Sequence, residues 1–174
     1  MLKILQTALF ELPAILAVKS NPWKTLAVRY ETPYVNRVWI QWGEYRINLH
    51  KIFPCEKSLY HPHPWPSAVI IFSGEYEMVL GKAHSFPVSL IRPKVGTVST
   101  VVLGAGSRYE MVNRNGWHSV NPLGSPSMSI MVTGKPWSRI SKTVPNQSNN
   151  RPLTELERDE ILDFFRSELS SVVA

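Results

Sequence analysis

The spacing of hydrophobic residues along the chain changes from a helical period to a strand period and back again. Near the N-terminus, leucines recur at intervals of three and four, as in an amphipathic helix: Leu2, Leu5, Leu9, Leu12 and Leu16. Pro13 fits poorly inside a helix, so we expect it to end or kink this one. Glu11 and Pro13 also interrupt the apolar run, which argues against a membrane span and against a signal peptide.

From about Leu26 onward the period becomes two. "VNRVWIQWG" alternates apolar and polar positions, and "YRINLHKIF" sets Tyr45, Ile47, Leu49 and Lys51 against Arg46, Asn48, His50 and Ile52. Further strands are expected at 68–72, 76–80, 85–91, 97–103, 107–112, 117–120 and 127–133. Glycines or prolines separate most of them, and short strands punctuated in this way predict an all-β sandwich or barrel.

The C-terminal part returns to a helical pattern. "VPNQSNNRP" is typical of a polar linker, and Thr154 with Glu157 then forms a capping-box pattern at the start of an amphipathic helix. We expect this helix to cover a sheet face or a partner subunit. The predicted organisation is a helical segment at 1–25, a β domain at 26–140, a linker at 141–152 and a helix at 153–174.

Composition narrows the class of protein. Hydrophobic residues make up 44% of the 174 residues and charged residues 18%, as in a globular domain. The single cysteine, Cys55, excludes an internal disulfide framework and favours a reducing, cytoplasmic location. The net charge is +6, but the basic residues are scattered without a nucleic-acid motif. We therefore expect no nucleic-acid or membrane partner.

The candidate chemistry lies in "LYHPHPWPSAVIIF". Residues two apart on a strand point to the same face, so His61 and His63 direct both imidazoles into one space, while Pro62 and Pro64 stiffen the segment. A pair of imidazoles at this spacing can chelate a transition metal. His118, in "NRNGWHSVNP", is the candidate for a third ligand.

These residues resemble the first motif of the cupin superfamily, which places H-x-H and a glutamate before a closing glycine. His61 and His63 match the pair, and Gly74 matches the glycine. "HPHPW" further resembles a group of small single-domain cupins with an HxHPW signature, whose activity is uncharacterised. The resemblance covers roughly half of the chain and implies a cupin double-stranded β-helix, or jelly roll, with an N-terminal and a C-terminal flanking helix.

The second cupin motif is matched by "GAGSRYEMVNRNGWHSVNP". His118 takes the place of its histidine, while Gly116 falls one position late, Asn121 one position early, and the proline is absent. The resemblance thus implies a metal site made of His61, His63 and His118.

One departure from the family bears on the chemistry. Ser67 stands where the first motif carries its metal-binding glutamate, and we expect it to face the site without ligating. Glu75 and Glu77 follow the Gly74 turn and should lie away from the site. A neutral three-histidine site leaves the charge of a divalent metal uncompensated. The resemblance then implies Fe(II), with Zn, Ni or Mn as alternatives, as in the three-histidine dioxygenases of the superfamily.

Four other side chains are candidates for the substrate pocket: Arg46, Tyr60, Trp65 and Tyr76. Arg46 could pair with a substrate carboxylate. His50 is expected to be a hydrogen-bonded wall residue, and His84 to be solvated. We also expect the strand faces around "YRINLHKI", "AVIIF" and "SMSIMV" to give the barrel a mostly apolar interior.

The leading functional hypothesis is a small-molecule oxygenase with a three-histidine iron site, acting as a homodimer. Two alternatives stay open. One is a metal-dependent isomerase or lyase, in which a tyrosine or glutamate moves protons. The other is a binding or sensing module without turnover, because a fold alone does not determine function.

Overall fold

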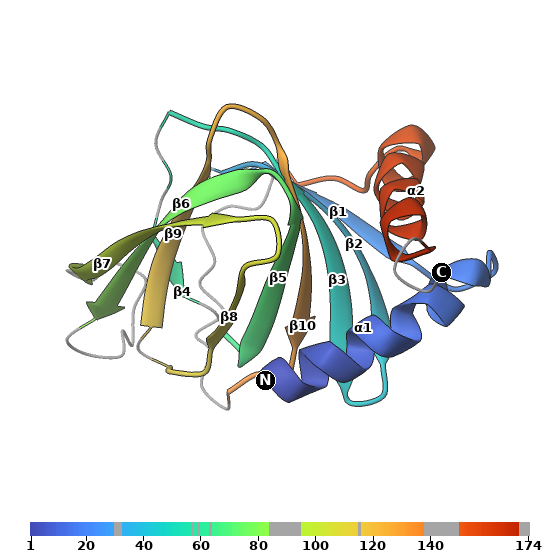
Figure 1. The fold of residues 1–174 in the computed structure, drawn as a ribbon, viewed down its shortest axis with the longest axis horizontal. Coiled ribbons are helices and arrows are strands. Elements are labelled where there is room, and N and C mark those ends of the chain that lie inside the picture. Colours follow the sequence, from blue (N-terminus) through green and yellow to red (C-terminus); the bar gives the residue numbers. More distant parts are fainter. Residues whose placement is uncertain are drawn as a thin grey trace.

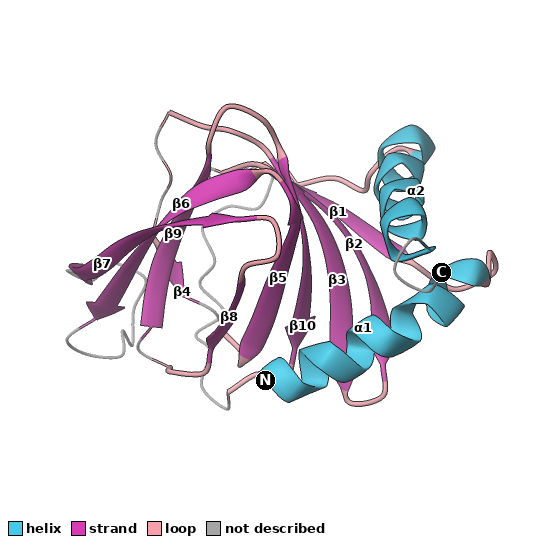
Figure 2. Ribbon diagram, in the orientation of Figure 1, coloured by secondary structure: helices cyan, strands magenta, loops and turns pink. Residues whose placement is uncertain are grey.

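The computed structural model describes residues 1–29, 33–56, 58, 60–62, 64–83, 95–114, 116–137 and 150–170. These residues form ten strands between two helices (Figures 1 and 2). The elements are α1 (Leu2–Ala17), β1 (Lys24–Val28), β2 (Val35–Trp42), β3 (Tyr45–Ile52), β4 (His61–Pro62), β5 (Ser67–Ser73), β6 (Glu75–Ala83), β7 (Val95–Gly104), β8 (Arg108–Met111), β9 (Gly116–Pro122), β10 (Ser127–Thr133) and α2 (Glu155–Ser170).

The strands form two antiparallel sheets that face each other. One has the order β1-β2-β3-β10-β5-β8 and the other the order β4-β9-β6-β7. From β3 to β10, successive strands mostly change sheet, so strands distant in sequence become neighbours. This is the arrangement of an eight-stranded jelly roll, here extended at one edge by β1 and β2. The predicted fold class is confirmed: an all-β jelly roll flanked by an N-terminal and a C-terminal helix.

The strands expected from alternation are found close to their predicted bounds, and β10 coincides with the predicted 127–133. The strand expected at 85–91 lies outside the described residues, as does His84. Gly74 forms the tight turn between β5 and β6 at φ +75°, and a Cβ there would lie 3.0 Å from the Pro126 carbonyl oxygen. No described helix is long and apolar enough to cross a membrane.

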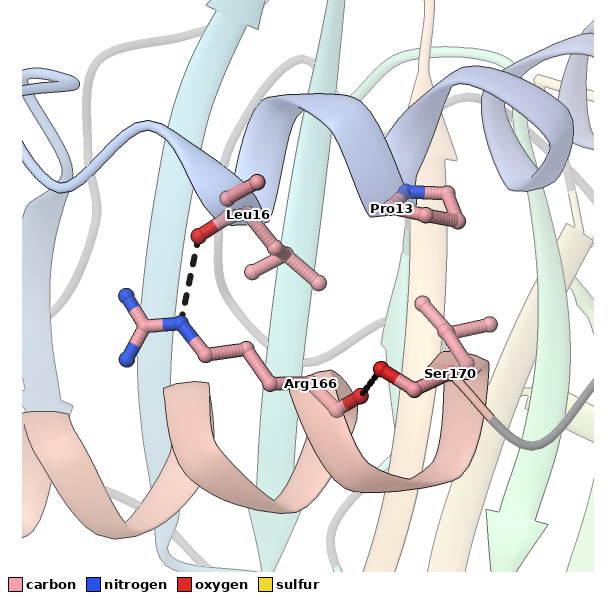
Figure 3. A pocket seen from close by; sticks show the side chains of 6 residues that line it. Pro13, Leu16, Arg166 and Ser170 are labelled. Atoms are coloured by element: carbon pink, nitrogen blue, oxygen red, sulfur yellow. Dashed lines mark hydrogen bonds between the residues drawn. The ribbon is translucent and has the colours of Figure 1, made fainter. Parts of the chain in front are cut away.

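Both helices cover the outer face of the six-stranded sheet (Figure 1). Leu5, Leu12 and Leu16 of α1 are almost completely buried, and Ile161 and Phe165 of α2 are fully buried against the same sheet. The helices also contact each other, because Arg166 Nε donates to the Leu16 carbonyl oxygen at 3.1 Å (Figure 3). The C-terminal helix was expected to cover a sheet face or a partner subunit. In the structure, α2 covers a sheet face.

Pro13 was expected to end or kink the first helix, and the first alternative is wrong, because α1 continues to Ala17. A proline inside a helix costs about 3 kcal/mol relative to alanine. Burying a leucine side chain contributes about 1.5–3 kcal/mol. Leu12 and Leu16 are both buried here, so their burial offsets the proline. Tertiary packing thus overrides the local preference.

A small hollow lies between the C-terminal ends of the two helices (Figure 3). Its lining residues are Pro13, Leu16, Ala17, Arg166, Leu169 and Ser170. None of these is a candidate site residue. The hollow is therefore a packing feature of the helical layer and does not bear on the candidate chemistry.

The expectation of an apolar barrel interior is wrong for β3 and β10. The apolar positions of these strands, such as Leu49 and Ile130, pack against the helices. The alternate positions face the second sheet and include the buried polar residues Asn48, His50 and Ser129. The more hydrophobic face of the six-stranded sheet points away from the second sheet, because both helices cover it on that side. The interior combines this polar wall with a small apolar cluster: Ile52, Ile71, Tyr76, Met78 and Val120.

The capping box at the start of α2 is confirmed. Glu157 N–H donates to Thr154 Oγ1 at 3.2 Å, and Thr154 N–H donates to a Glu157 carboxylate oxygen at 2.8 Å. Arg151 also donates two hydrogen bonds to this carboxylate, at 2.6 and 2.7 Å. Arg151, followed by the Thr154 N–H, lowers the pKa of Glu157 to about 2. Because the folded pKa is lowered, this stabilisation is complete above about pH 4.5 and is lost as the pH falls toward 2.

Thr154→Ala should lower the free energy of unfolding by about 1 kcal/mol, as for other lost N-caps. Urea denaturation at pH 7 measures the change. Thr154→Ser keeps the hydroxyl and serves as the matched control, so it should stay close to the wild type. Equal stability of the two variants would show that the cap does not stabilise α2.

Candidate metal site

Two of the three predicted ligands meet between neighbouring strands of the four-stranded sheet. His61 on β4 lies directly opposite His118 on β9, and directly opposed residues on antiparallel strands share a face. Their Nε2 atoms are 3.0 Å apart, and their rings meet edge to face with centroids 4.5 Å apart. Two nitrogens that each lie about 2.1 Å from one metal ion at a right angle are about 3.0 Å apart. The spacing fits two adjacent ligands of one metal ion, and it equally fits a hydrogen bond between the two rings.

The surroundings of His118 fit one of its two tautomers. Its Nδ1 lies 3.4 Å from Met78 Sδ, on the neighbouring strand β6. A thioether sulfur can only accept, so this contact is a hydrogen bond in the tautomer that carries its proton on Nδ1 and its lone pair on Nε2. A metal-binding imidazole needs its lone pair on the nitrogen that faces the ion. His118 is 2% exposed, which protects this arrangement from water.

The loop before β4 is attached to the strand that carries His118. Ser58 Oγ accepts a hydrogen bond from Val120 N–H at 3.1 Å. The half-buried Cys55 contributes a weaker contact, from its Sγ to Asn121 Oδ1 at 3.4 Å. These contacts attach the loop before His61 to β9. The alignment of the two imidazoles therefore does not depend on the short strand β4 alone.

The segment after β4 is fixed by the chain that follows β10. The carbonyl oxygens of Pro64 and Pro66 accept hydrogen bonds from Trp137 N–H and Gly134 N–H, at 3.0 and 2.9 Å. Between the two prolines, Trp65 is half-buried, and its buried indole N–H has no hydrogen-bond partner among the described residues. His63, the second histidine of the motif, lies outside the described residues.

Two tyrosines lie behind the histidine pair. Tyr76 on β6 is fully buried, and its hydroxyl donates to that of Tyr109 on β8 at 3.0 Å. The Tyr109 ring contacts the His118 ring edge to face, with centroids 6.2 Å apart. Burial raises the pKa of Tyr76 well above its ordinary value and that of Tyr109 to about 12. Tyr76 was among the predicted pocket residues, whereas Tyr109 was not, although the alternation in "SRYEM" indicates that it faces inward.

Two further predicted residues, Arg46 and His50, lie on β3, and a third, Tyr60, lies beside β4. Arg46 stacks its guanidinium on the Trp39 ring, 3.9 Å from the centroid. Tyr60 is half-buried and directly precedes β4. His50 is buried and accepts a hydrogen bond from Arg37 Nε at 3.0 Å, so it is the wall residue that was expected.

The carboxylates near the motif do not join the histidines. Tyr76 and Met78 of β6 face the interior, so the alternating positions Glu75 and Glu77 face the other side of the sheet. Ser67 is fully buried at the start of β5. Within the described ranges, which leave out His63, no three His, Cys, Asp or Glu side chains gather into a metal-binding group.

Comparison with known proteins gives similarity at the level of structure. No family model and no curated protein matches the sequence. A crystal structure of Fe(II)-HppE with the alternative substrate (S)-1-HPP aligns with a TM-score of 0.48 at 13% identity, over 64% of this chain and 56% of that chain. Hydroxypropylphosphonic acid epoxidase from S. wedmorenis aligns with a TM-score of 0.46 at 12% identity, over 64% and 55%.

A protein of unknown function from Streptococcus pyogenes, SPY1581, aligns with a TM-score of 0.41 at 14% identity. That alignment covers 63% of this chain and 80% of the other. The chain thus spans just over half the length of the HppE structures it matches. At these scores the function has to be argued from the site itself.

Proposed function

We propose that this protein is a metal-dependent cupin that holds one divalent transition metal through His61, His63 and His118. The observation that carries the proposal is the 3.0 Å separation of His61 Nε2 and His118 Nε2. The Nδ1 contact with Met78, which leaves the His118 lone pair on Nε2, supports it independently. His63 is proposed as the third ligand from the H-x-H spacing in the sequence, because residues two apart on a strand share a face.

The proposed reaction class is oxygenation of a small molecule, with Fe(II) as the favoured metal. Fe(II) bound there would supply dioxygen activation and substrate binding at open coordination positions. Three neutral imidazoles leave the two positive charges of the ion uncompensated, which favours an anionic substrate. The buried polar wall of Asn48, His50 and Ser129 favours a substrate with hydrogen-bonding groups over a purely apolar one.

Arg46 is the proposed partner for the acidic group of the substrate. Its guanidinium makes no ion pair within the described part of the chain and lies over the Trp39 ring, 3.9 Å from the ring centroid. Burial without a counter-charge lowers the pKa of Arg46. A stacked guanidinium whose donors stay available is well suited to a carboxylate or similar anion. Tyr60 and Trp65, which flank the H-x-H motif, are proposed to shape the rim of the pocket.

Oxygen uptake by the iron-loaded protein tests this function. With thiols, diketones and small carboxylates as substrates, at least one class should produce substrate-dependent oxygen consumption. The activity should vanish in His63→Ala, because a ligand is lost. Iron bound at one equivalent with no uptake across the panel would contradict the oxygenase and favour the binding module.

A further inference from the structure

The tyrosine pair has one more hydroxyl hydrogen than the described structure uses. Tyr76 and Tyr109 together carry two hydroxyl hydrogens, and one of them forms the 3.0 Å bond between the two oxygens. The other has no acceptor among the described residues. Each hydroxyl thus has one partner, and the second hydrogen remains available for donation to a ligand.

The positions of the two tyrosines indicate whose hydroxyl hydrogen can reach a ligand. Tyr76 is 0% exposed and lies within the apolar cluster of Ile71 and Met78. Tyr109 is half-buried, and its ring lies against the ring of His118. When Tyr76 donates to Tyr109, the Tyr109 hydrogen is the one left over. A tyrosine hydroxyl is both a donor and an acceptor, so this hydrogen can be donated to a ligand.

We propose that Tyr109 is a ligand-contacting residue whose hydroxyl donates a hydrogen bond to an anionic or oxygen-bearing ligand bound beside His61 and His118. Tyr76 is its positioning residue, because it donates to the Tyr109 oxygen and so restricts the directions that the remaining hydrogen can take. This inference rests on the proposed function, since it needs a ligand at the histidines. It adds a specific recognition group for an acceptor atom of that ligand.

Azide binding to the cobalt-loaded protein tests the proposal without any turnover. The visible absorption spectrum of bound cobalt(II) changes when a small anion binds to the metal. Azide is a suitable anion because its nitrogens can accept a hydrogen bond. A hydrogen bond to a charged group contributes about 1.5–3 kcal/mol, which corresponds to a loss of at least about tenfold in azide affinity for Tyr109→Phe. Tyr76→Phe keeps the Tyr109 hydroxyl but removes the hydrogen bond that orients it, so azide affinity should fall by less than in Tyr109→Phe. Cobalt affinity should be unchanged in both variants.

The double variant Tyr76→Phe/Tyr109→Phe separates recognition from packing. It removes the hydroxyl that Tyr109→Phe leaves unpaired on Tyr76, so thermal stability should recover while azide affinity stays low. If cobalt binds but azide affinity is equal in the wild type and Tyr109→Phe, or azide does not perturb the wild-type spectrum, the role of Tyr109 is overturned and the metal site stands. If the wild type binds no cobalt, the proposed function fails and this inference fails with it.

Discussion

His118→Ala should reduce the affinity for a divalent transition metal by more than about 100-fold. Loss of an outer-shell partner of a metal-binding histidine costs about 10–100-fold, and loss of the ligand itself should exceed this. The variant removes the nitrogen that lies 3.0 Å from His61 Nε2. Metal content after dialysis against a weak chelator, measured by inductively coupled plasma mass spectrometry, gives the result.

His50→Ala is the matched control. His50 is likewise a buried histidine on a jelly-roll strand, but it is bonded to Arg37 and is not one of the proposed ligands. It should retain about one equivalent of metal, and circular dichroism should show both variants folded. Retention of metal by a folded His118→Ala protein would show that His118 is not a ligand.

Phe165→Ala should lower the free energy of unfolding by about 3–5 kcal/mol, the range for truncation of a fully buried phenylalanine. Phe165 is 0% exposed and packs edge to face on Phe72 of β5, with ring centroids 5.4 Å apart. It therefore joins α2 to the outer face of the six-stranded sheet. In a domain of this size, the loss corresponds to a fall in melting temperature of roughly 10 °C.

Phe164→Ala provides the comparison on the same helix. Phe164 is only partly buried, although its ring contacts that of Phe165 at 5.0 Å. Its truncation should cost clearly less than that of Phe165, as measured by urea denaturation. Similar small effects for both variants would show that α2 does not pack on the sheet in solution.

The strand pattern and the capping box could be predicted because each depends on neighbouring residues. Alternation marks strands such as β10, and Thr154 with Glu157 marks a helix start. The continuation of α1 past Pro13 could not be predicted, because it depends on the burial of Leu12 and Leu16 against distant strands. Likewise, alternation divides β3 into two faces without indicating which one the helices cover. That is why the interior was expected to be apolar.

The candidate site was partly predictable for a related reason. The H-x-H spacing and the cupin resemblance pointed to His61, His63 and His118 before any contact was known. Met78 and Tyr109 could not be assigned to the same site, since they reach His118 only through the pairing of β6 with β9 and the packing of β8 across the interior. Such long-range pairings set the tautomer of a histidine but leave no local signal in the sequence.

X-ray absorption spectroscopy of the iron(II)-loaded protein tests the central claim most directly. The three-histidine site predicts nitrogen and oxygen scatterers at about 2.0–2.2 Å, with the outer-shell multiple scattering of three imidazole rings. The imidazole contribution should fall by about one third in His63→Ala protein that is held at saturating iron. A spectrum without imidazole scattering would contradict the claim that His61 and His118 meet in order to bind a metal.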